Sequence, residues 1–211
     1  MKPARRFLPG LPAFSLRAVL SVVLLSWVVG CSSSHFYANY YLDPKPPKLS
    51  FADLQPPASP QPVYLVFDMY AGGTAFAEAT RKLGPRIARV VEESGLFSSL
   101  SKVGSENMAR IQVSLRETAV MSGREMRSLP DGLTSGLTGS KGAIVYQFTI
   151  SYQAPGREPF KKVFPHAVHI VEGTSPALAD AFPMTASHAM DAMVDQGMLR
   201  FLRDLQREGK L

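Results

Sequence analysis

Apolar and polar residues alternate strictly in two stretches of the chain, residues 110–116 and residues 144–152. This period of two is typical of a strand with one buried face. The turn-forming pair Pro155-Gly156 follows the second stretch, so residues 162–171 are expected to return as its antiparallel partner. Pro165 would place that partner at an edge of the sheet or introduce a bulge. The inward positions of the first strand are Ile111, Val113 and Leu115.

Two longer stretches repeat apolar residues with the period of a helix. The first runs from Thr74, a possible N-cap, to Gly95, a possible C-cap. Its apolar stripe keeps its phase through Gly84-Pro85, which predicts one kinked helix rather than two. The second stretch spans about residues 184–207, where the methionines are expected to fill the core.

The order of these elements predicts the fold class. An apolar run at residues 63–67 reads as a further, buried strand, and Gly72-Gly73 turns the chain toward the first helix. Two helices on one face of a mostly antiparallel, roughly four-stranded sheet would bury both apolar stripes. We therefore expect residues 63–211 to form an α+β two-layer sandwich domain.

The N-terminal 30 residues have the pattern of an export signal. Residues 18–30 are apolar apart from Ser21 and Ser26, and four cations but no acidic residue precede Cys31. This apolar segment is shorter than the roughly 20 residues that span a bilayer. A cleaved signal peptide over residues 1–30 is the prediction, and an uncleaved membrane anchor is the alternative. The four cations are Lys2, Arg5, Arg6 and Arg17.

The sequence Val28-Val29-Gly30-Cys31 resembles the lipobox of bacterial lipoproteins, where signal peptidase II cuts before a cysteine. The resemblance implies that Cys31 becomes the first residue and carries acyl lipid, palmitate among it. No other cofactor is expected. In such lipoproteins a serine at the position of Ser32 is typical of sorting to the outer membrane, whereas aspartate is typical of retention at the inner membrane. We expect the periplasmic leaflet of the outer membrane.

Charge and cysteine content narrow the possible functions. The chain has a net charge of +6, and four of these positive charges leave with residues 1–30. The remaining domain is only weakly basic, so nucleic-acid binding is not expected. Cys31 is the only cysteine, which excludes a disulfide within one chain.

Residues 31–62 are predicted to form an aromatic and then proline-rich tether. The aromatic residues either lie at the membrane interface or pack on the domain. Seven prolines between residues 43 and 62 favour an extended chain with a reach of roughly 60 Å. Leu49, Phe51 and Leu54 interrupt this stretch, and they either dock on the domain or bind a partner. The candidate interfacial residues are Phe36, Tyr37, Tyr40 and Tyr41.

The long glycine-rich loop of residues 122–142 offers Leu133 and Leu137 as candidate partner contacts, with a plain hairpin connection as the alternative. No catalytic or metal site is predicted. His166 and His169 lie three apart on a strand, so their side chains point to opposite faces. Ser140 lacks the glycine pattern of a nucleophile elbow, and no carboxylate pair suggests a glycosidase.

The order and size of residues 63–207 resemble small accessory lipoproteins of the Gram-negative envelope, such as those of lipopolysaccharide assembly, penicillin-binding-protein activation and lipid transport. The passage Glu93-Ser-Gly-Leu-Phe97 is similar in style to their helix-to-strand junction. The resemblance implies a lipid-anchored, periplasm-facing protein that binds an envelope protein without catalysis. The alternative is a carrier or sensor of a lipid or glycan, with a groove between helices and sheet. A hydrolase is the third possibility.

Overall fold

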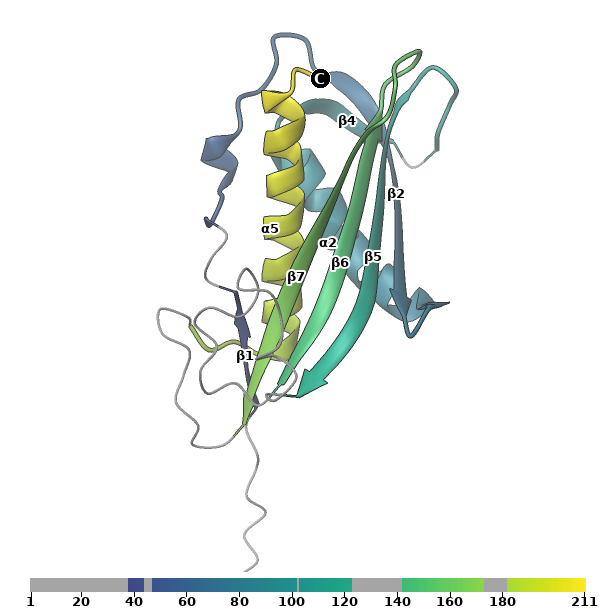
Figure 1. The fold of residues 1–211 in the computed structure, drawn as a ribbon. Coiled ribbons are helices and arrows are strands. Elements are labelled where there is room, and N and C mark those ends of the chain that lie inside the picture. The colour runs from purple at the N-terminus through teal and green to yellow at the C-terminus, as the bar shows by residue number, and fades with distance from the viewer. Residues whose placement is uncertain (1–37, 44–46, 102, 123–141, 173–181) are drawn as a thin grey trace, which may run out of the picture. The chain divides into compact units, whose positions relative to one another are not determined.

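A twisted sheet carries two helices on one of its faces (Figure 1). The structure, a computed structural model, describes residues 38–43, 47–101, 103–122, 142–172 and 182–211. The signal peptide, the lipobox and most of the glycine-rich loop lie outside these residues.

Four long strands form the body of the sheet and correspond to the four that the sequence predicts. Three short strands are added to them, so the sheet has seven strands in all, with the order β1-β7-β6-β5-β2-β3 and β4 paired with β2. The expected number of strands was therefore too low. The long strands are β2 (Gln61–Ala71), β5 (Ala109–Ser122), β6 (Gly142–Gln153) and β7 (Phe160–Glu172). The short ones are β1 (Ala38–Leu42), β3 (Thr74–Ala75) and β4 (Phe97–Ser101).

The short strands escape the sequence patterns because they pair at the ends of longer neighbours. β4 is mostly serine and has no alternating apolar positions, yet it lies parallel to the start of β2. β1 pairs with the last five residues of β7. β2 runs parallel to β4 and β5, and the remaining pairs are antiparallel. These segments form strands because a neighbouring strand offers them backbone hydrogen-bonding groups, and not because of their local β-propensity.

The helices α2 (Ala77–Glu93) and α5 (Ala186–Arg207) cover one face of the sheet (Figure 1). As predicted, α2 continues through Pro85 as one helix. Gly84 makes this possible because it has no Cβ to clash with the following proline ring. Gly95, at φ +67°, turns the chain after α2. The predicted Thr74 cap was wrong, because Thr74 lies in β3 and Phe76 occupies the N-cap position.

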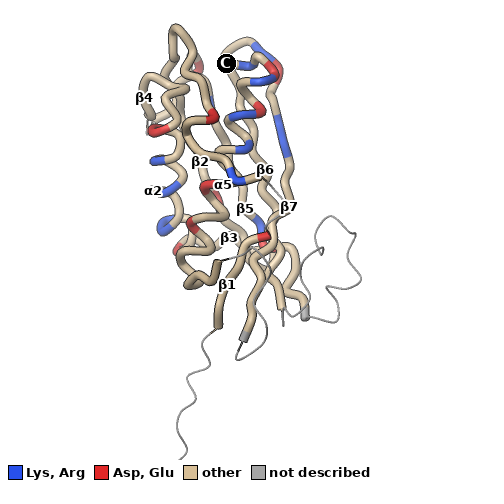
Figure 2. Tube along the Cα trace, turned by 90° about the vertical axis from the view of Figure 1, so that its left-hand side faces the viewer, with Lys and Arg blue, Asp and Glu red and all other residues tan. Residues whose placement is uncertain are grey.

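The hydrophobic core lies between the helices and the sheet. The predicted inward residues of β5 and several from α5 are fully buried, including Met193 and Met198. Pro165 pairs with Gln147, beyond the stretch of β7 that β1 covers, so it lies at an open edge where no second neighbour needs its missing N–H. Charges of both signs are spread along α2 and α5 (Figure 2).

The described part of the predicted tether lies on the domain. Residues 38–42 are β1, and Tyr41 is buried at 2% exposure. Residues 47–60 form an arm beside α5, with a short 3-10 helix, η1 (Phe51–Asp53), along its course (Figure 1). Leu54 is buried in the core and Leu49 packs against it. Docking, one of the two alternatives left open by the sequence, is what the structure shows for these leucines.

Candidate binding groove

A groove of about 840 Å³ opens between the starts of the two helices and the sheet. Its volume lies within the range of small-molecule sites in proteins. Its walls are mainly apolar, and its rim carries charges of both signs. The apolar lining comes from Met69, Phe76, Ala79, Leu83, Tyr146 and Met190, and the charged lining from Glu78, Lys82, Glu117 and Asp191.

The turn at Gly72-Gly73 positions the start of α2 against the end of β2, on one side of the groove. Both glycines have positive φ angles, at 56° and 83°, which lets β3 fold back on the end of β2. The N–H of Phe76 then donates to the carbonyl of Met69 at 2.8 Å. The Met69 N–H donates to the hydroxyl of Thr80 at 2.9 Å. These bonds fix the start of α2 against the strand.

On the opposite wall, α5 begins with a side-chain cap. Thr185 accepts a hydrogen bond at its hydroxyl oxygen from the backbone N–H of His188, at 3.3 Å. One residue earlier, Met184 and Tyr40 exchange two backbone hydrogen bonds of 3.0 Å, which attach this end of α5 to β1. The cap and the bridge fix the position of the groove wall formed by Thr185, Ala186 and Ser187.

Tyr146 forms the floor of the groove on β6. Burial, with the nearby carboxylate of Glu117 as a second cause, raises the pKa of Tyr146 to about 12. Tyr146 is therefore protonated at neutral pH and presents a neutral, largely apolar surface. The formal charge of the groove then comes from three carboxylates and one lysine, which leaves the rim net acidic.

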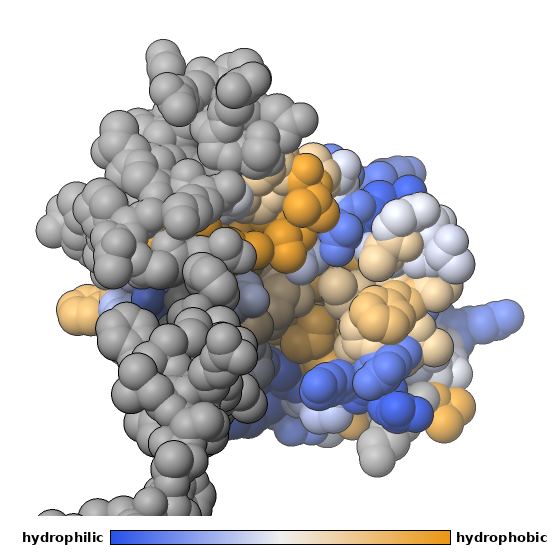
Figure 3. Space-filling model, turned by 90° about the horizontal axis from the view of Figure 1, so that it is seen from below, coloured by the Kyte–Doolittle hydropathy of each residue, from blue (hydrophilic) through white to orange (hydrophobic). Residues whose placement is uncertain are grey.

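Two apolar side chains at this end of the sheet are exposed, and Phe76 is one of the residues that line the groove. Phe76 is 44% exposed, and Val120, on the helix-facing side of β5 beyond Glu117, is 69% exposed. Figure 3 views this end of the molecule and shows apolar surface around a hollow, with hydrophilic side chains beside it. Large apolar side chains at the entrance of an apolar groove indicate a binding surface.

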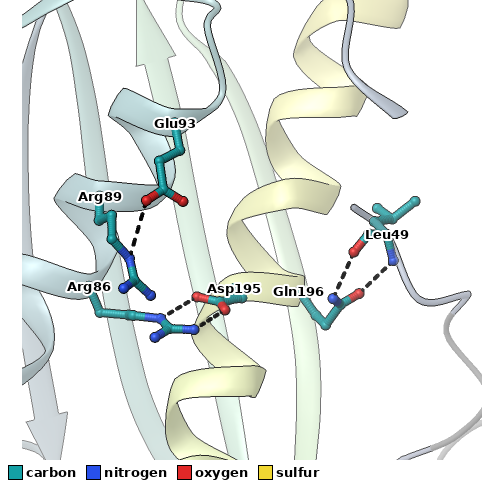
Figure 4. A network of polar contacts seen from close by, with 6 residues as sticks. All are labelled: Leu49, Arg86, Arg89, Glu93, Asp195 and Gln196. Carbon is teal, nitrogen blue, oxygen red and sulfur yellow. Dashed lines mark hydrogen bonds and ion pairs between the residues drawn. The ribbon is translucent and has the colours of Figure 1, made fainter. Parts of the chain in front are cut away.

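Polar contacts fix the helices and the arm next to the groove (Figure 4). Arg86 on α2 makes a two-pronged ion pair with Asp195 on α5, and its Nε donates to Asp195 Oδ1 at 2.6 Å. This partnership raises the pKa of Arg86. On the other side of α5, Gln196 pairs with the backbone of Leu49. The groove walls are thus tied to one another independently of any occupant.

The two histidines of β7 point to opposite faces of the sheet, as predicted. His166 is in register with Tyr146 on the helix side, and His169 with Ala143 and Tyr41 on the other side. Burial is the first cause that lowers the pKa of each to about 4, and the positive charges of Arg200 and His166 add to it, respectively. In the part of the chain that the structure describes, no cluster of potential ligands for a metal ion is found.

The residues singled out from the sequence are mostly outside the described ranges. Cys31, its lipobox neighbours Val28, Val29 and Gly30, and Ser32 stay predictions, as do Leu133, Leu137, Phe36 and Tyr37. Tyr40 and Tyr41 are described, and β1 brings both onto the domain. The groove residues were missed because Phe76 reads as one more member of the apolar stripe of α2. Only the three-dimensional arrangement shows that Phe76 lies at the open end of that stripe.

No protein-family model and no curated protein sequence matches the chain. Among solved structures, a minor lipoprotein from Acinetobacter baumannii is 11% identical, with a TM-score of 0.34, over 71% of this chain and 94% of its own. Rare lipoprotein B from Shewanella oneidensis is 12% identical, with a TM-score of 0.32, over 70% and 94%. PelC from Paraburkholderia phytofirmans is 10% identical, with a TM-score of 0.33, over 78% and 97%. Two of these neighbours are thus named as lipoproteins, but scores this low support no argument about function.

Among the described residues, no helix has both the length and the hydrophobicity to cross a membrane.

Proposed function

We propose that this chain is a lipid-anchored accessory protein of the bacterial envelope, which faces the periplasm and acts by binding, without catalysis and without a cofactor. The lipobox-like sequence that ends at Cys31, the only cysteine, supports the anchor. The leaflet we propose is the periplasmic side of the outer membrane, because Ser32 follows the cysteine. An envelope protein is the proposed partner.

The groove is the observation that carries the binding role. It combines apolar walls, a few charged groups and rigid sides, which are the properties expected of a site that binds a ligand or a partner's anchor residue. Binding is the function that this combination supports best.

A second candidate function, a carrier or sensor of a lipid or glycan, is favoured by the position of the groove between the helix layer and the sheet. The core below the groove is filled, so the space available to a ligand lies at one end of the domain. A lipid fits the apolar walls better than a glycan, because glycan recognition needs more hydrogen-bonding groups.

The anchor is tested by replacing Cys31 with Ala and measuring the mass of the product. We expect an unprocessed, unacylated precursor, whereas the unsubstituted chain begins at an acylated Cys31. Normal processing of the Cys31→Ala variant would refute the lipobox. Cross-linking in intact cells followed by gentle solubilisation and mass spectrometry then tests the partner, and recovery of lipid alone would favour the carrier function.

A further inference from the structure

The chain enters the domain at the end where the groove opens. β1 begins at Ala38, which is in register with Glu172 at the end of β7. Tyr40, two residues later, bridges to Met184, and the next residue, Thr185, lines the groove. The N-terminal connection and the groove therefore belong to the same end of the molecule.

The connection from this end to Cys31 is short. Residues 32–37 separate Cys31 from β1, and a fully extended chain of that length spans at most about 25 Å. The described proline-rich arm, residues 47–60, lies along α5, where Gln196 and Gln206 bind the backbone of Leu49 and Gln55, so it does not lengthen this connection. If Cys31 is lipidated, the groove end stays close to the bilayer.

This end also carries exposed apolar side chains suited to a membrane surface. Phe76 lines the groove and is 44% exposed, Val120 on β5 is 69% exposed, and Phe182, whose ring centroid lies 5.6 Å from Lys48 Nζ, is 74% exposed. Aromatic side chains gain free energy at the membrane–water interface. Behind them, an apolar groove of about 840 Å³ offers space for a flexible hydrocarbon chain.

The charges of the rim favour a particular headgroup. Glu78, Glu117 and Asp191 outnumber Lys82 in the groove lining, although Arg86, which is paired with Asp195, also interacts with the charge of Asp191. An anionic headgroup would be repelled by the net negative rim, whereas an ammonium group would be attracted. A phospholipid with an ammonium group beside its phosphate fits this groove, because its acyl chain can contact the apolar walls and its ammonium can approach the carboxylates of the rim.

We infer that the groove end of the domain rests on the bilayer that holds Cys31, and that the groove receives an acyl chain of a zwitterionic phospholipid from it. This inference rests on the proposed lipid anchor. The proposed occupant is a lipid of the protein's own membrane, so the inference develops the second candidate function, the carrier or sensor of a lipid, and not the binding of a protein partner in the groove.

Single-tryptophan fluorescence in vesicles tests the orientation. Trp27 is the only tryptophan and leaves with the predicted signal peptide, so each added tryptophan reports alone. Phe76→Trp and Phe182→Trp place the probe at the groove end, and Val103→Trp places it at an exposed site between β4 and β5, at the opposite end. The full acylated protein is inserted into phosphatidylcholine vesicles with quenching nitroxides in the acyl chains. We expect loss of fluorescence for the first two variants and no loss for Val103→Trp.

Occupation of the groove is tested separately. In the Phe76→Trp protein, Ala79→Phe fills part of the groove, whereas Ala77→Phe changes an exposed residue that does not line it. Ala79→Phe should reduce quenching by a nitroxide in the middle of the acyl chain, and Ala77→Phe should not. Glu117→Gln should reduce the preference for phosphatidylcholine over phosphatidylglycerol vesicles. Thermal unfolding of each variant checks that the fold is intact.

The possible results distinguish a failure of the proposed lipid anchor from a failure of the inferred membrane orientation. A mature protein whose mass shows no acyl lipid on Cys31 would overturn both. An acylated protein in which Val103→Trp is quenched as strongly as Phe76→Trp, or in which neither is quenched, would overturn the inference alone. Cross-linking of Phe76 to a protein segment rich in Lys and Arg, without lipid in the groove, would also overturn it.

Discussion

Gln196 on α5 binds both backbone polar groups of Leu49 through its side-chain amide. The Leu49 N–H donates to Gln196 Oε1 at 2.8 Å, and Gln196 Nε2 donates to the Leu49 carbonyl at 3.0 Å (Figure 4). Gln206 and Gln55 repeat this arrangement further along the helix. A glutamine amide thereby replaces the neighbouring strand that an extended segment otherwise needs. The arm of residues 47–60 is part of the domain for this reason.

Replacing Gln196 with Ala is expected to loosen the arm. Two hydrogen bonds with a net worth of about 1 kcal/mol each are lost, so the free energy of unfolding should fall by about 2 kcal/mol. Hydrogen exchange at the Leu49 amide should become faster. Gln196→Glu is the matched control, since it keeps an acceptor for the N–H but cannot donate to the carbonyl. Unchanged exchange at Leu49 in Gln196→Ala would contradict the role of the amide.

The pair Arg86–Asp195 is expected to couple α2 to α5 only modestly. Both side chains are about one-quarter exposed, so solvent screens part of their attraction. A double-mutant cycle with Arg86→Ala and Asp195→Ala, followed by urea unfolding, should give a coupling free energy of about 1 kcal/mol or less. The i,i+4 pair Arg89–Glu93, with N and O atoms 3.8 Å apart at the surface, is the control and should give less. Equal couplings would show that the two-pronged geometry adds nothing.

Acid should destabilise the domain through the buried histidines of β7. Each has a folded-state pKa lowered to about 4, against about 6.5 in the unfolded chain. As the pH falls from 6.5 toward 4, the histidines are therefore protonated in the unfolded state but remain neutral in the folded state. The free energy of unfolding decreases as a result. At pH 5 the loss should be about 2 kcal/mol per histidine relative to pH 7.

The contribution of His169 can be isolated by His169→Phe, which keeps an aromatic ring but does not titrate. The imidazole nitrogens of His169 are buried and have no hydrogen-bond partner among the residues that the structure describes, so this change breaks no described hydrogen bond. Urea unfolding between pH 7 and pH 5 should show a shallower loss of stability in the variant. A pH dependence identical to that of the unsubstituted protein would rule out the histidine as a source of acid sensitivity.

Gly197 is expected to be intolerant of larger residues because α5 approaches the sheet closely there. A Cβ at this position would lie 3.2 Å from two ring atoms of Phe148, which is fully buried. Gly197→Val should lower the free energy of unfolding by about 1–3 kcal/mol through overpacking. Ala192→Val, at a partly exposed site of the same helix, should cost only the smaller helix-propensity difference of a β-branched residue. Similar losses at the two sites would argue against the close contact.

The two-layer sandwich could be predicted from the amino-acid sequence, because the patterns that indicate its main elements are local. Alternation predicted β5 and β6, and an apolar run predicted β2. The apolar stripe predicted that α2 continues past Pro85. The helix does so because burial of its apolar face outweighs the cost of one lost backbone hydrogen bond. The pattern at Cys31 also predicted an anchor, which awaits its test.

The short strands, the docking of the arm and the groove depend on contacts between residues that are far apart in the sequence. β1 is a strand because the end of β7 offers unpaired backbone groups, and the proline-rich arm is fixed by glutamines nearly 150 residues away. Likewise, Phe76 is exposed because α2 and α5 begin apart from each other at one end of the sheet, which no local pattern encodes. Contacts between distant residues decide these features, and hydrophobic periodicity reports only on neighbours within a few residues.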